Sequence, residues 1–320
     1  MTGRKQSVKI NNDHYSDWKL IQRGVPQGSI LGPILFIIFI NDLPLVVQDK
    51  LFLYADDTAV ICEERNEELL LRKMKHSSEQ LNKWFNENGL KINSTKTEVI
   101  KFGNYSELPT QMKLLNSEVT LAKQVTFLGL CIDSNLNWKM HIEKLYIKLS
   151  KAIYIIRYLK NIVSENCLLN IYYAYFHANL VYGILFWGNS SNAHKIFLLQ
   201  KKCIRIMAGV RPRHSCRELF KKYNILTLYD VFILDCALFI NKNRILFHEN
   251  VSKTKHDTRN REKLQLLQTN LSVVQRGVRN AMIRIDNQIP QHLKTDKQFK
   301  KKLKKRLIEE CNYSLKHYLK

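Results

Sequence analysis

Two adjacent carboxylates, Asp56 and Asp57, are the residues whose types and spacing point most directly to chemistry. They lie in LFLYADDTAVIC, residues 51–62, where apolar or aromatic residues lead into the pair and mostly apolar residues follow it. This pattern predicts a β-hairpin with buried flanks and a turn at Asp56-Asp57. Tight hairpin turns favour glycine-containing pairs, and on a buried rim one of two neighbouring carboxyls should resist ionisation. A divalent cation held by both would compensate, because hard cations prefer carboxylate oxygens. The sequence therefore predicts a metal-dependent catalytic hairpin.

A glycine-rich loop precedes this hairpin. Residues 23–29 read RGVPQGS, and such a loop brings backbone close to a ligand because glycine has no Cβ. Residues 4–23 before it alternate weakly and predict a hairpin. Ser29 is the expected N-cap of an apolar helix that reaches Asn41 and is closed by Asp42 and Pro44. Gln27 and Ser29 at a helix N-terminus suit phosphate binding, although a plain loop-to-helix entry explains them equally well.

After the hairpin, residues 63–85 show helical spacing, and Gly89 is placed to end that helix. Residues 90–93 and 98–102 alternate like strands, with Lys96 in the turn between them. Lys96 is either a surface lysine or a contact for a substrate phosphate. Residues 125–132 predict another buried strand or hairpin, in which Gly129 marks a close approach of backbone.

Charge is distributed unevenly along the 320 residues. The net charge is +23, with 45% hydrophobic and 25% charged residues, and the last two values are ordinary for a globular protein. Residues 1–140 carry 17 Lys and Arg against 16 Asp and Glu, whereas residues 141–320 carry 34 against 12. A polyanionic partner held mainly by the second half is the expectation.

Seven cysteines with irregular spacing argue against a disulfide framework and favour a reducing compartment. Cys203, His214 and Cys216 match no familiar zinc spacing, so buried thiols are the favoured interpretation. The start of the chain lacks the apolar core of a signal peptide. Residues 166–194 are uncharged and long enough to span a bilayer, but their histidine, asparagines and tyrosines favour a buried helix pair instead.

Several motifs together carry a family resemblance. RGVPQGSILGPILFIIFINDLP, LYADDTAV, LNKWFNENGLKINSTKTEVIKF and VTFLGLCIDSNLNWKMHI stand in the order and spacing of the reverse transcriptase domain of non-LTR (LINE-type) retrotransposons. The chain resembles the Jockey-like branch of invertebrates most, over roughly residues 4–140. The resemblance implies an α+β fold: a partial polymerase palm with residual fingers over residues 1–140, a helical thumb and connection over 141–250, and a basic linker with amphipathic helices over 251–320.

The resemblance also implies roles for single residues. Asp56 and Asp57 would hold catalytic Mg²⁺ (or Mn²⁺), so that two metal ions stabilise the attacking and leaving oxygens of nucleotidyl transfer. Lys96 would approach the triphosphate. The implied nucleotide and template contacts are Gly24, Pro26, Gln27, Gly28, Ser29, Tyr54 and Ala55, and the implied primer grip is Phe127, Leu128 and Gly129. The implied partners are an RNA template, a DNA primer, their RNA–DNA hybrid and deoxynucleoside triphosphates, with no membrane.

One feature of the family is missing. Such polymerases carry a third metal-binding carboxylate upstream of the glycine-rich loop, yet only 23 residues precede Gly24, and Asp13, Asp17 and Asp42 are poor substitutes. The expectation is the C-terminal part of a retrotransposon polymerase, with little or no activity alone. A non-catalytic nucleic-acid-binding remnant is the alternative. The compartment implied is intracellular, in cytoplasm and nucleus.

The second half is expected to be mostly helical. Residues 141–159 place Ile142, Leu145, Leu149, Ile153 and Ile156 on one stripe, and the family resemblance makes this helix part of the thumb. Residues 252–261 predict a linker. The last helix carries Phe299, Leu303 and Leu307 on one side among lysines, and either binds nucleic acid or docks on the thumb. The tail resembles that of Jockey-like proteins, except that Asp286 stands where those usually carry an aromatic residue.

Overall fold

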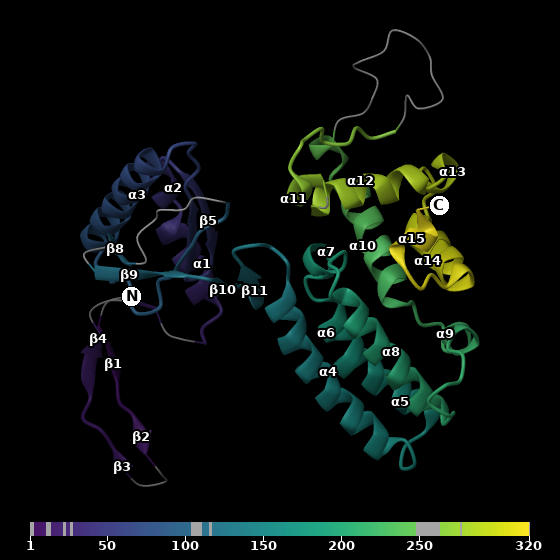
Figure 1. Cartoon of the computed structure of the whole chain (residues 1–320). Coiled ribbons are helices and arrows are strands. Elements are labelled where there is room, and N and C mark those ends of the chain that lie inside the picture. The colour runs from purple at the N-terminus through teal and green to yellow at the C-terminus, as the bar shows by residue number, and fades with distance from the viewer. Residues whose placement is uncertain are drawn as a thin grey trace. The chain divides into compact units, whose positions relative to one another are not determined.

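The structure is a computed structural model that describes residues 3–10, 14–21, 24–25, 28–103, 111–114, 117–247, 263–275 and 277–319 (Figure 1). These residues combine helices with small sheets and belong to the α+β class, as expected from the sequence. Two compact units are present. The first comprises residues 1–99 and 104–122, and the second comprises residues 100–103 and 123–320.

The first unit begins with the hairpin expected over residues 4–23. Strand β1 (Arg4–Gln6) pairs antiparallel with β4 (Lys19–Ile21), and β2 (Lys9–Ile10) pairs with β3 (His14–Tyr15). The prediction of a hairpin is confirmed. Its apolar side chains are largely exposed, Trp18 at 69%, so the hairpin is held by its own ladder rather than by a core.

Two helices and a hairpin form the centre of the first unit. Helix α1 (Leu31–Ile40) leads into α2 (Leu43–Val46), which carries Pro44 in its first turn, and then into the antiparallel strands β5 (Lys50–Tyr54) and β6 (Asp57–Ile61). A small core of Ile40, Leu43, Val47 and Trp84 joins these elements. Most apolar side chains of α1 lie outside this core, including Ile37 and Ile38, which are 58% and 67% exposed.

Helix α3 (Glu67–Glu87) has both ends fixed by local chemistry. The Asn66 side chain accepts hydrogen bonds from the backbone N–H groups of Glu68 and Leu69, which caps the first turn. At the other end Gly89 has φ +67°, and Leu90 N donates to Phe85 O at 2.8 Å. This 6→1 bond is the Schellman arrangement in which glycine ends a helix, so the predicted role of Gly89 is confirmed.

A three-stranded sheet completes the first unit. Its order is β7 (Val99–Ile100), β9 (Ser117–Ala122) and β8 (Gln111–Leu114). The strand predicted at residues 90–93 is wrong, because no strand forms there. Asn93 O accepts from Lys96 N and from Thr97 Oγ1, and Asn93 Oδ1 accepts from Thr95 Oγ1. Such local side-chain bonds compete with strand pairing.

The second unit opens with a hairpin and a long helix. Strand β10 (Gln124–Phe127) pairs antiparallel with β11 (Leu130–Asp133), and α4 (Lys139–Leu159) follows. The predicted apolar stripe of α4 is confirmed, since all five of its residues are buried. The remaining elements in chain order are α5 (Glu165–Ile171), the π-helix η1 (Tyr172–His177), α6 (Ala178–Val181), α7 (Ile184–Trp187), α8 (Ala193–Ala208), α9 (Arg217–Lys222), α10 (Leu228–Lys242), the 3₁₀-helix η2 (Arg244–Leu246), α11 (Ser272–Gln275), α12 (Val278–Gln288), α13 (Gln291–Lys294), α14 (Phe299–Glu310) and α15 (Leu315–Tyr318).

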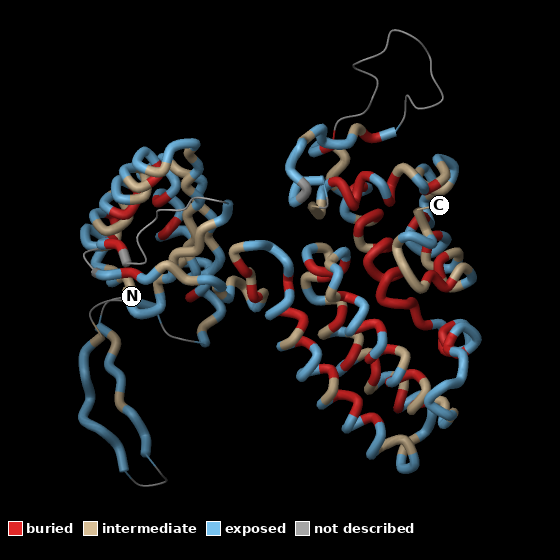
Figure 2. Tube along the Cα trace, viewed as in Figure 1, coloured by how far each residue is buried: buried red, intermediate tan, exposed pale blue. Residues whose placement is uncertain are grey.

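Helix α10 is the centre of the second unit (Figure 2). Ten of its residues are buried, on all sides of the helix, which is typical of a helix enclosed by others. It packs against α7, α8, α12 and α14. A buried Gln200 on α8 also ties the chain together, since its side chain donates to Leu226 O at 2.9 Å and accepts from Leu228 N at 2.8 Å.

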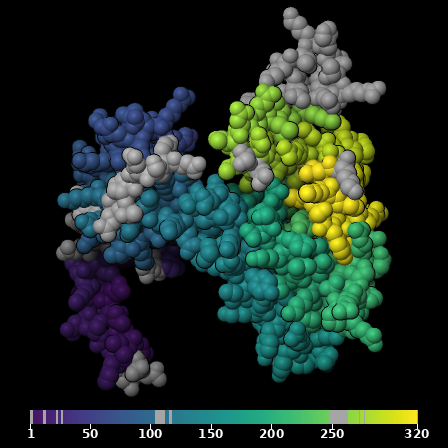
Figure 3. All heavy atoms as spheres, viewed as in Figure 1, coloured from purple at the N-terminus to yellow at the C-terminus, as the bar shows by residue number. Residues whose placement is uncertain are grey.

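The C-terminal segment docks on this centre. Phe299, Leu303 and Leu307 are buried, as the predicted one-sided pattern of α14 requires. Helix α14 contacts α9 and α10, and the space-filling view shows the yellow C-terminal segment against the green part of the chain (Figure 3). The linker predicted at residues 252–261 lies outside the described residues.

Two alternatives from the sequence receive no structural support. Within the described ranges, none of the helices combines the length and the apolar character needed to cross a bilayer. The disfavoured alternative of a zinc site at Cys203, His214 and Cys216 finds no support either. Cys203 is buried, Cys216 Sγ donates to Lys201 O, and no cluster of three potential ligands is found where the chain is described. All seven cysteines are free thiols.

Candidate active site

The turn of the β5–β6 hairpin lies one residue earlier than predicted. Tyr54 pairs with Asp57 across the ladder, so the two turn residues are Ala55 and Asp56, and Asp57 is the first residue of β6. The predicted Asp56-Asp57 turn is therefore wrong. The register follows from the alternation of β5, in which Leu51 and Leu53 are partly buried while Phe52 and Tyr54 are exposed.

Backbone strain is concentrated at this turn. Ala55 has φ +52°, in the left-handed region, where a residue with a Cβ costs about 1–2 kcal/mol. Glycine is the usual residue with positive φ at the first position of a two-residue hairpin turn. Strain of this kind collects at functional sites, where the surrounding structure holds it in place.

The two carboxylates are open to solvent. Asp56 and Asp57 are both exposed, which corrects the expectation of a buried rim. Neither carboxylate forms a hydrogen bond or an ion pair with any residue that the structure describes. Their oxygens are therefore available as hard ligands, and the pair fits part of a divalent-cation site. Over the described ranges no third His, Cys, Asp or Glu completes a cluster.

The base of the hairpin is anchored to α3 by a polar cluster around Asp49. The Asp49 carboxylate accepts a hydrogen bond from Ser77 Oγ at 2.5 Å and forms an ion pair with Lys73 at 3.3 Å. Cys62 Sγ, just after β6, donates to the same carboxylate at 3.4 Å. Burial alone would raise the pKa of Asp49, but these hydrogen bonds lower it overall. Burial and the Asp49 charge raise the pKa of Cys62 to about 11, so this thiol is inert at neutral pH.

The glycine-rich loop is described in part. Gly24 and Gly28 have φ of +89° and +77°, so both need the freedom of glycine. Ser29 Oγ accepts from Gly32 N at 3.0 Å, which confirms Ser29 as a cap of α1, one residue before the assigned boundary. Pro26 and Gln27 lie outside the described residues.

Lys96 lies exposed in the turn of residues 93–96. No hydrogen bond or ion pair joins it to Asp56 or Asp57 in the part of the chain that the structure describes. Its contact with a substrate phosphate stays a prediction.

The hairpin expected at residues 125–132 forms, with its turn at Leu128-Gly129. Both turn residues have positive φ, +46° and +76°, as type I′ hairpin turns require. The hydroxyl of Tyr182, which follows α6, donates a hydrogen bond to Leu128 O. A Cβ on Gly129 would lie 3.3 Å from Tyr182 Cε1, so the predicted close backbone approach at Gly129 is confirmed. Phe127 pairs with Leu130 beside the turn.

The predicted site residues thus fall into separate groups. Tyr54, Ala55, Asp56 and Asp57 share one turn of the first unit, whereas Phe127, Leu128 and Gly129 belong to the second unit. Sequence reasoning missed Tyr182, because nothing local marks a partner 54 residues away. It placed Asp133 at the end of the implied primer grip but did not predict that its carboxylate accepts from the backbone N–H groups of Asn135, Asn137 and Trp138. The DSNLN composition was the available signal for that turn.

Comparison with known proteins provides evidence that is independent of the structure. Residues 4–132 match the family described as reverse transcriptase (RNA-dependent DNA polymerase). The RNA-directed DNA polymerase from mobile element jockey of Drosophila melanogaster is 26% identical over 241 residues, which cover 71% of this chain and 26% of that protein. Its Drosophila funebris counterpart is 30% identical over 224 residues, 65% of this chain and 24% of that protein.

A third relative is the probable RNA-directed DNA polymerase from transposon X-element of Drosophila melanogaster, 23% identical over 80% of this chain and 28% of that protein. The chain therefore spans about a quarter of the length of the curated relatives it matches. No solved structure matches it. Residues 4–132 therefore match a reverse transcriptase domain of the jockey-like, non-LTR retrotransposon type, and most of the chain is similar to RNA-directed DNA polymerases of such elements.

Proposed function

We propose that this chain carries the catalytic turn of an RNA-directed DNA polymerase, with Asp56 and Asp57 as ligands for Mg²⁺ or Mn²⁺. The observation that carries the proposal is the pair of exposed carboxylates without partners on a strained turn, inside the segment that matches the family. A divalent cation bound there would stabilise the negative charge on the transferred phosphoryl group. The polypeptide's own contribution is to hold the two carboxylates at the end of an anchored hairpin.

The other predicted residues take supporting roles in this proposal. Lys96 would contact the triphosphate as a point charge. Gly24, Pro26, Gln27, Gly28, Ser29, Tyr54 and Ala55 would line the nucleotide and template, and Phe127, Leu128 and Gly129 would hold the primer. In the same proposal residues 1–140 correspond to the palm with residual fingers, residues 141–250 to a helical thumb and connection, and residues 251–320 to a basic linker with amphipathic helices. RNA template, DNA primer, their hybrid and deoxynucleoside triphosphates are the proposed partners, in cytoplasm and nucleus.

The level of activity depends on the number of carboxylates. Metal-dependent nucleotidyl transfer uses two cations, and the described residues offer two clustered carboxylates and no third. We therefore expect this chain by itself to bind a divalent cation weakly and to extend primers little or not at all. Extension of a primer on a homopolymer template, above an Asp56→Ala, Asp57→Ala control, would contradict the expectation of low activity while supporting the polymerase assignment.

Metal binding tests the assignment of the two aspartates directly. The probe is Mn²⁺, followed by its electron paramagnetic resonance signal in the presence of the full chain. Asp57→Asn should abolish the bound fraction, whereas Asp17→Asn, an exposed carboxylate in the N-terminal hairpin, should leave it unchanged. Equal binding by the wild type and Asp57→Asn would overturn the proposed metal site.

A second candidate function is nucleic-acid binding without catalysis. The charge distribution favours it, since 34 Lys and Arg against 12 Asp and Glu lie in residues 141–320. Binding of an RNA–DNA hybrid should weaken steeply with salt, because each neutralised phosphate releases counterions. Tight binding together with no Mn²⁺ site would favour this candidate over the polymerase.

A further inference from the structure

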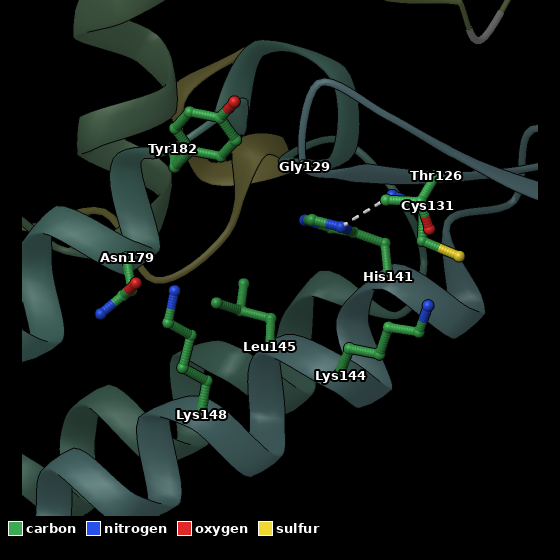
Figure 4. Close-up of a pocket in the computed structure, with 9 residues that line it drawn as sticks. All are labelled: Thr126, Gly129, Cys131, His141, Lys144, Leu145, Lys148, Asn179 and Tyr182. Carbon is green, nitrogen blue, oxygen red and sulfur yellow. Dashed lines mark hydrogen bonds between the residues drawn. The ribbon is translucent and has the colours of Figure 1, made fainter. Parts of the chain in front are cut away.

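A cavity of about 140 Å³ lies beneath the β10–β11 turn in the second unit (Figure 4). This is well above the roughly 10–15 Å³ that one buried water needs. Its wall is built from the turn, from one face of α4 and from the segment around α6. The lining residues that matter here are Gly129, His141, Lys144, Lys148, Asn179 and Tyr182. None of the described lining residues is a carboxylate.

His141 brings a buried donor to this cavity. Its side chain is 8% exposed and packs against the rings of Trp138 and Trp187, with centroids 6.2 and 6.1 Å away. His141 Nδ1 accepts a hydrogen bond from Cys131 N at 3.4 Å. Burial, together with the charge of Lys144, lowers the pKa of His141. A neutral imidazole that accepts at Nδ1 carries its proton on Nε2.

This Nε2–H group finds no hydrogen-bond acceptor within the described protein. His141 Nε2 is buried and has no hydrogen-bond partner among the described residues. A buried donor without an acceptor is unfavourable, so the site is complete only with an acceptor supplied from outside. Because Nε2 is closed to water in the cavity as well as to bulk solvent, contact with it requires a small shift of the cavity wall.

Two lysines give the cavity a positive charge. Lys144 and Lys148 lie three and seven residues after His141, a spacing that puts all three on one face of α4. Figure 4 shows the Lys148 side chain rising from α4 toward Asn179, on the side of the free ring nitrogen of His141, whereas the Lys144 side chain extends toward Cys131. Neither lysine forms an ion pair where the chain is described. The Tyr182 hydroxyl donates its hydrogen to Leu128 O, so towards the cavity its oxygen can only accept a hydrogen bond.

We propose that this cavity binds one backbone phosphate of a nucleic-acid strand, with His141 donating from Nε2 and Lys148 and Lys144 balancing the charge. A phosphate combines acceptor oxygens with negative charge, which is what two ammonium groups and an unused N–H donor recognise. The identification of the occupant as nucleic acid rests on the proposed function. Its effect would be to fix a strand against the Leu128-Gly129 turn.

The first test uses inorganic phosphate and the full chain labelled with ¹⁵N at histidine. The His141 resonance is assigned by its absence in His141→Gln, and its ¹⁵N shifts should show the proton on Nε2. Added phosphate should move this resonance saturably, beyond chloride at the same ionic strength. Lys148→Ala should weaken the phosphate response about 10-fold, as loss of a charge-assisted bond predicts.

The matched control is Lys151→Ala, which removes an exposed lysine of the same helix that does not line the cavity. It should leave the phosphate response of His141 unchanged. No movement of the His141 resonance, or an equal response in Lys148→Ala and the wild type, would overturn the inference and leave a water-filled cavity as the explanation.

The second test uses a short RNA–DNA hybrid. The wild type should bind it, and in the complex added phosphate should no longer shift the His141 resonance. Lys148→Ala should reduce the slope of log affinity against log salt by about 0.9, the value for one phosphate contact. If the hybrid binds without any change in the His141 resonance, the proposed phosphate site in the cavity is wrong, and the proposed function is unaffected. A phosphate response with no hybrid binding would overturn the nucleic-acid assignment together with the proposed function.

Discussion

Asp230, in the first turn of α10, accepts hydrogen bonds from both the backbone N–H and the side-chain amide of Asn312, at 3.1 and 2.8 Å. The two residues are separated by 82 positions and both are buried. Thr227, the N-cap of α10, completes the group: its Oγ1 lies 2.8 Å from Asp230 Oδ2 and 2.7 Å from Asn312 O. The C-terminal segment is thereby fastened to the central helix by polar contacts as well as by α14.

The number of donors in this group favours the protonated form of Asp230. Thr227 has one hydroxyl hydrogen and two neighbouring acceptors, so one contact lacks a proton if Asp230 is ionised. A protonated Asp230 donates to Thr227 Oγ1 and frees the threonine hydrogen for Asn312 O. Burial raises the pKa of Asp230 to about 7, although the hydrogen bonds with Asn312 and Thr227 act to lower it.

Stability of the second unit should therefore decrease as pH rises from about 4 to about 7. The folded state holds the proton of Asp230 more tightly than the unfolded chain, whose pKa is the ordinary 3.8. The stabilisation by the Asp230 proton is complete below the pKa of the unfolded chain and is lost as pH rises through the pKa of the folded state. It amounts to at most about 4 kcal/mol. Urea unfolding across this range measures it. Asp230→Asn cannot titrate and should lose this part of the pH dependence; an unchanged slope in that variant would contradict the prediction.

The buried ion pair between Asp286 and Lys294 makes a second prediction. The atoms are 2.6 Å apart, and the two side chains are 4% and 8% exposed. Lys294→Met should cost about 3–5 kcal/mol, because it leaves a buried carboxylate uncompensated. The double variant Asp286→Phe, Lys294→Met removes both buried charges and should recover most of that loss. Denaturant midpoints of the single and double variants decide the matter, and equal midpoints would refute the coupling.

The β10–β11 turn should be intolerant of a side chain at Gly129. Gly129→Ala places a Cβ at φ +76° and 3.3 Å from the Tyr182 ring, and the backbone strain alone costs about 1–2 kcal/mol. Tyr182→Phe removes only the hydrogen bond to Leu128 O and should cost about 1 kcal/mol. Thermal unfolding of the two variants gives the comparison. A Gly129→Ala protein as stable as the wild type would show that the turn does not need glycine.

Asp49 should stabilise the hairpin that bears Asp56 and Asp57, the proposed metal ligands, without touching them. Asp49→Asn weakens the bonds from Ser77, Lys73 and Cys62 and should cost about 1–3 kcal/mol. Since the pKa of Asp49 is lowered, its contribution is present above the ordinary pKa of 3.8 and is lost as pH falls below that value. Hydrogen exchange at the amides of β5 and β6 reports the loosening. The control Glu87→Gln, on the exposed end of α3, should leave those amides unchanged.

The sequence by itself determined the local elements of this protein. The ends of α3 at Asn66 and Gly89, the cap at Ser29, the stripe of α4 and the three hairpins, apart from the register of β5–β6, follow from side-chain chemistry within a few residues along the chain. Local geometry can be predicted because helix and turn contacts join residues at fixed short spacings. The motif around Asp56 and Asp57 could be recognised in the sequence for the same reason, since its residues are contiguous.

Only the tertiary structure decided the contacts between distant residues. The turn at Ala55-Asp56 depends on cross-strand pairing of Tyr54 with Asp57, since a shift of one residue would turn the buried face of β5 outward. Tyr182 reaches Leu128, Asn312 reaches Asp230, and the cavity at His141 gathers residues from a hairpin and two helical segments. Such pairs carry no mark in a single sequence, because their free energy arises only when packing removes both groups from water.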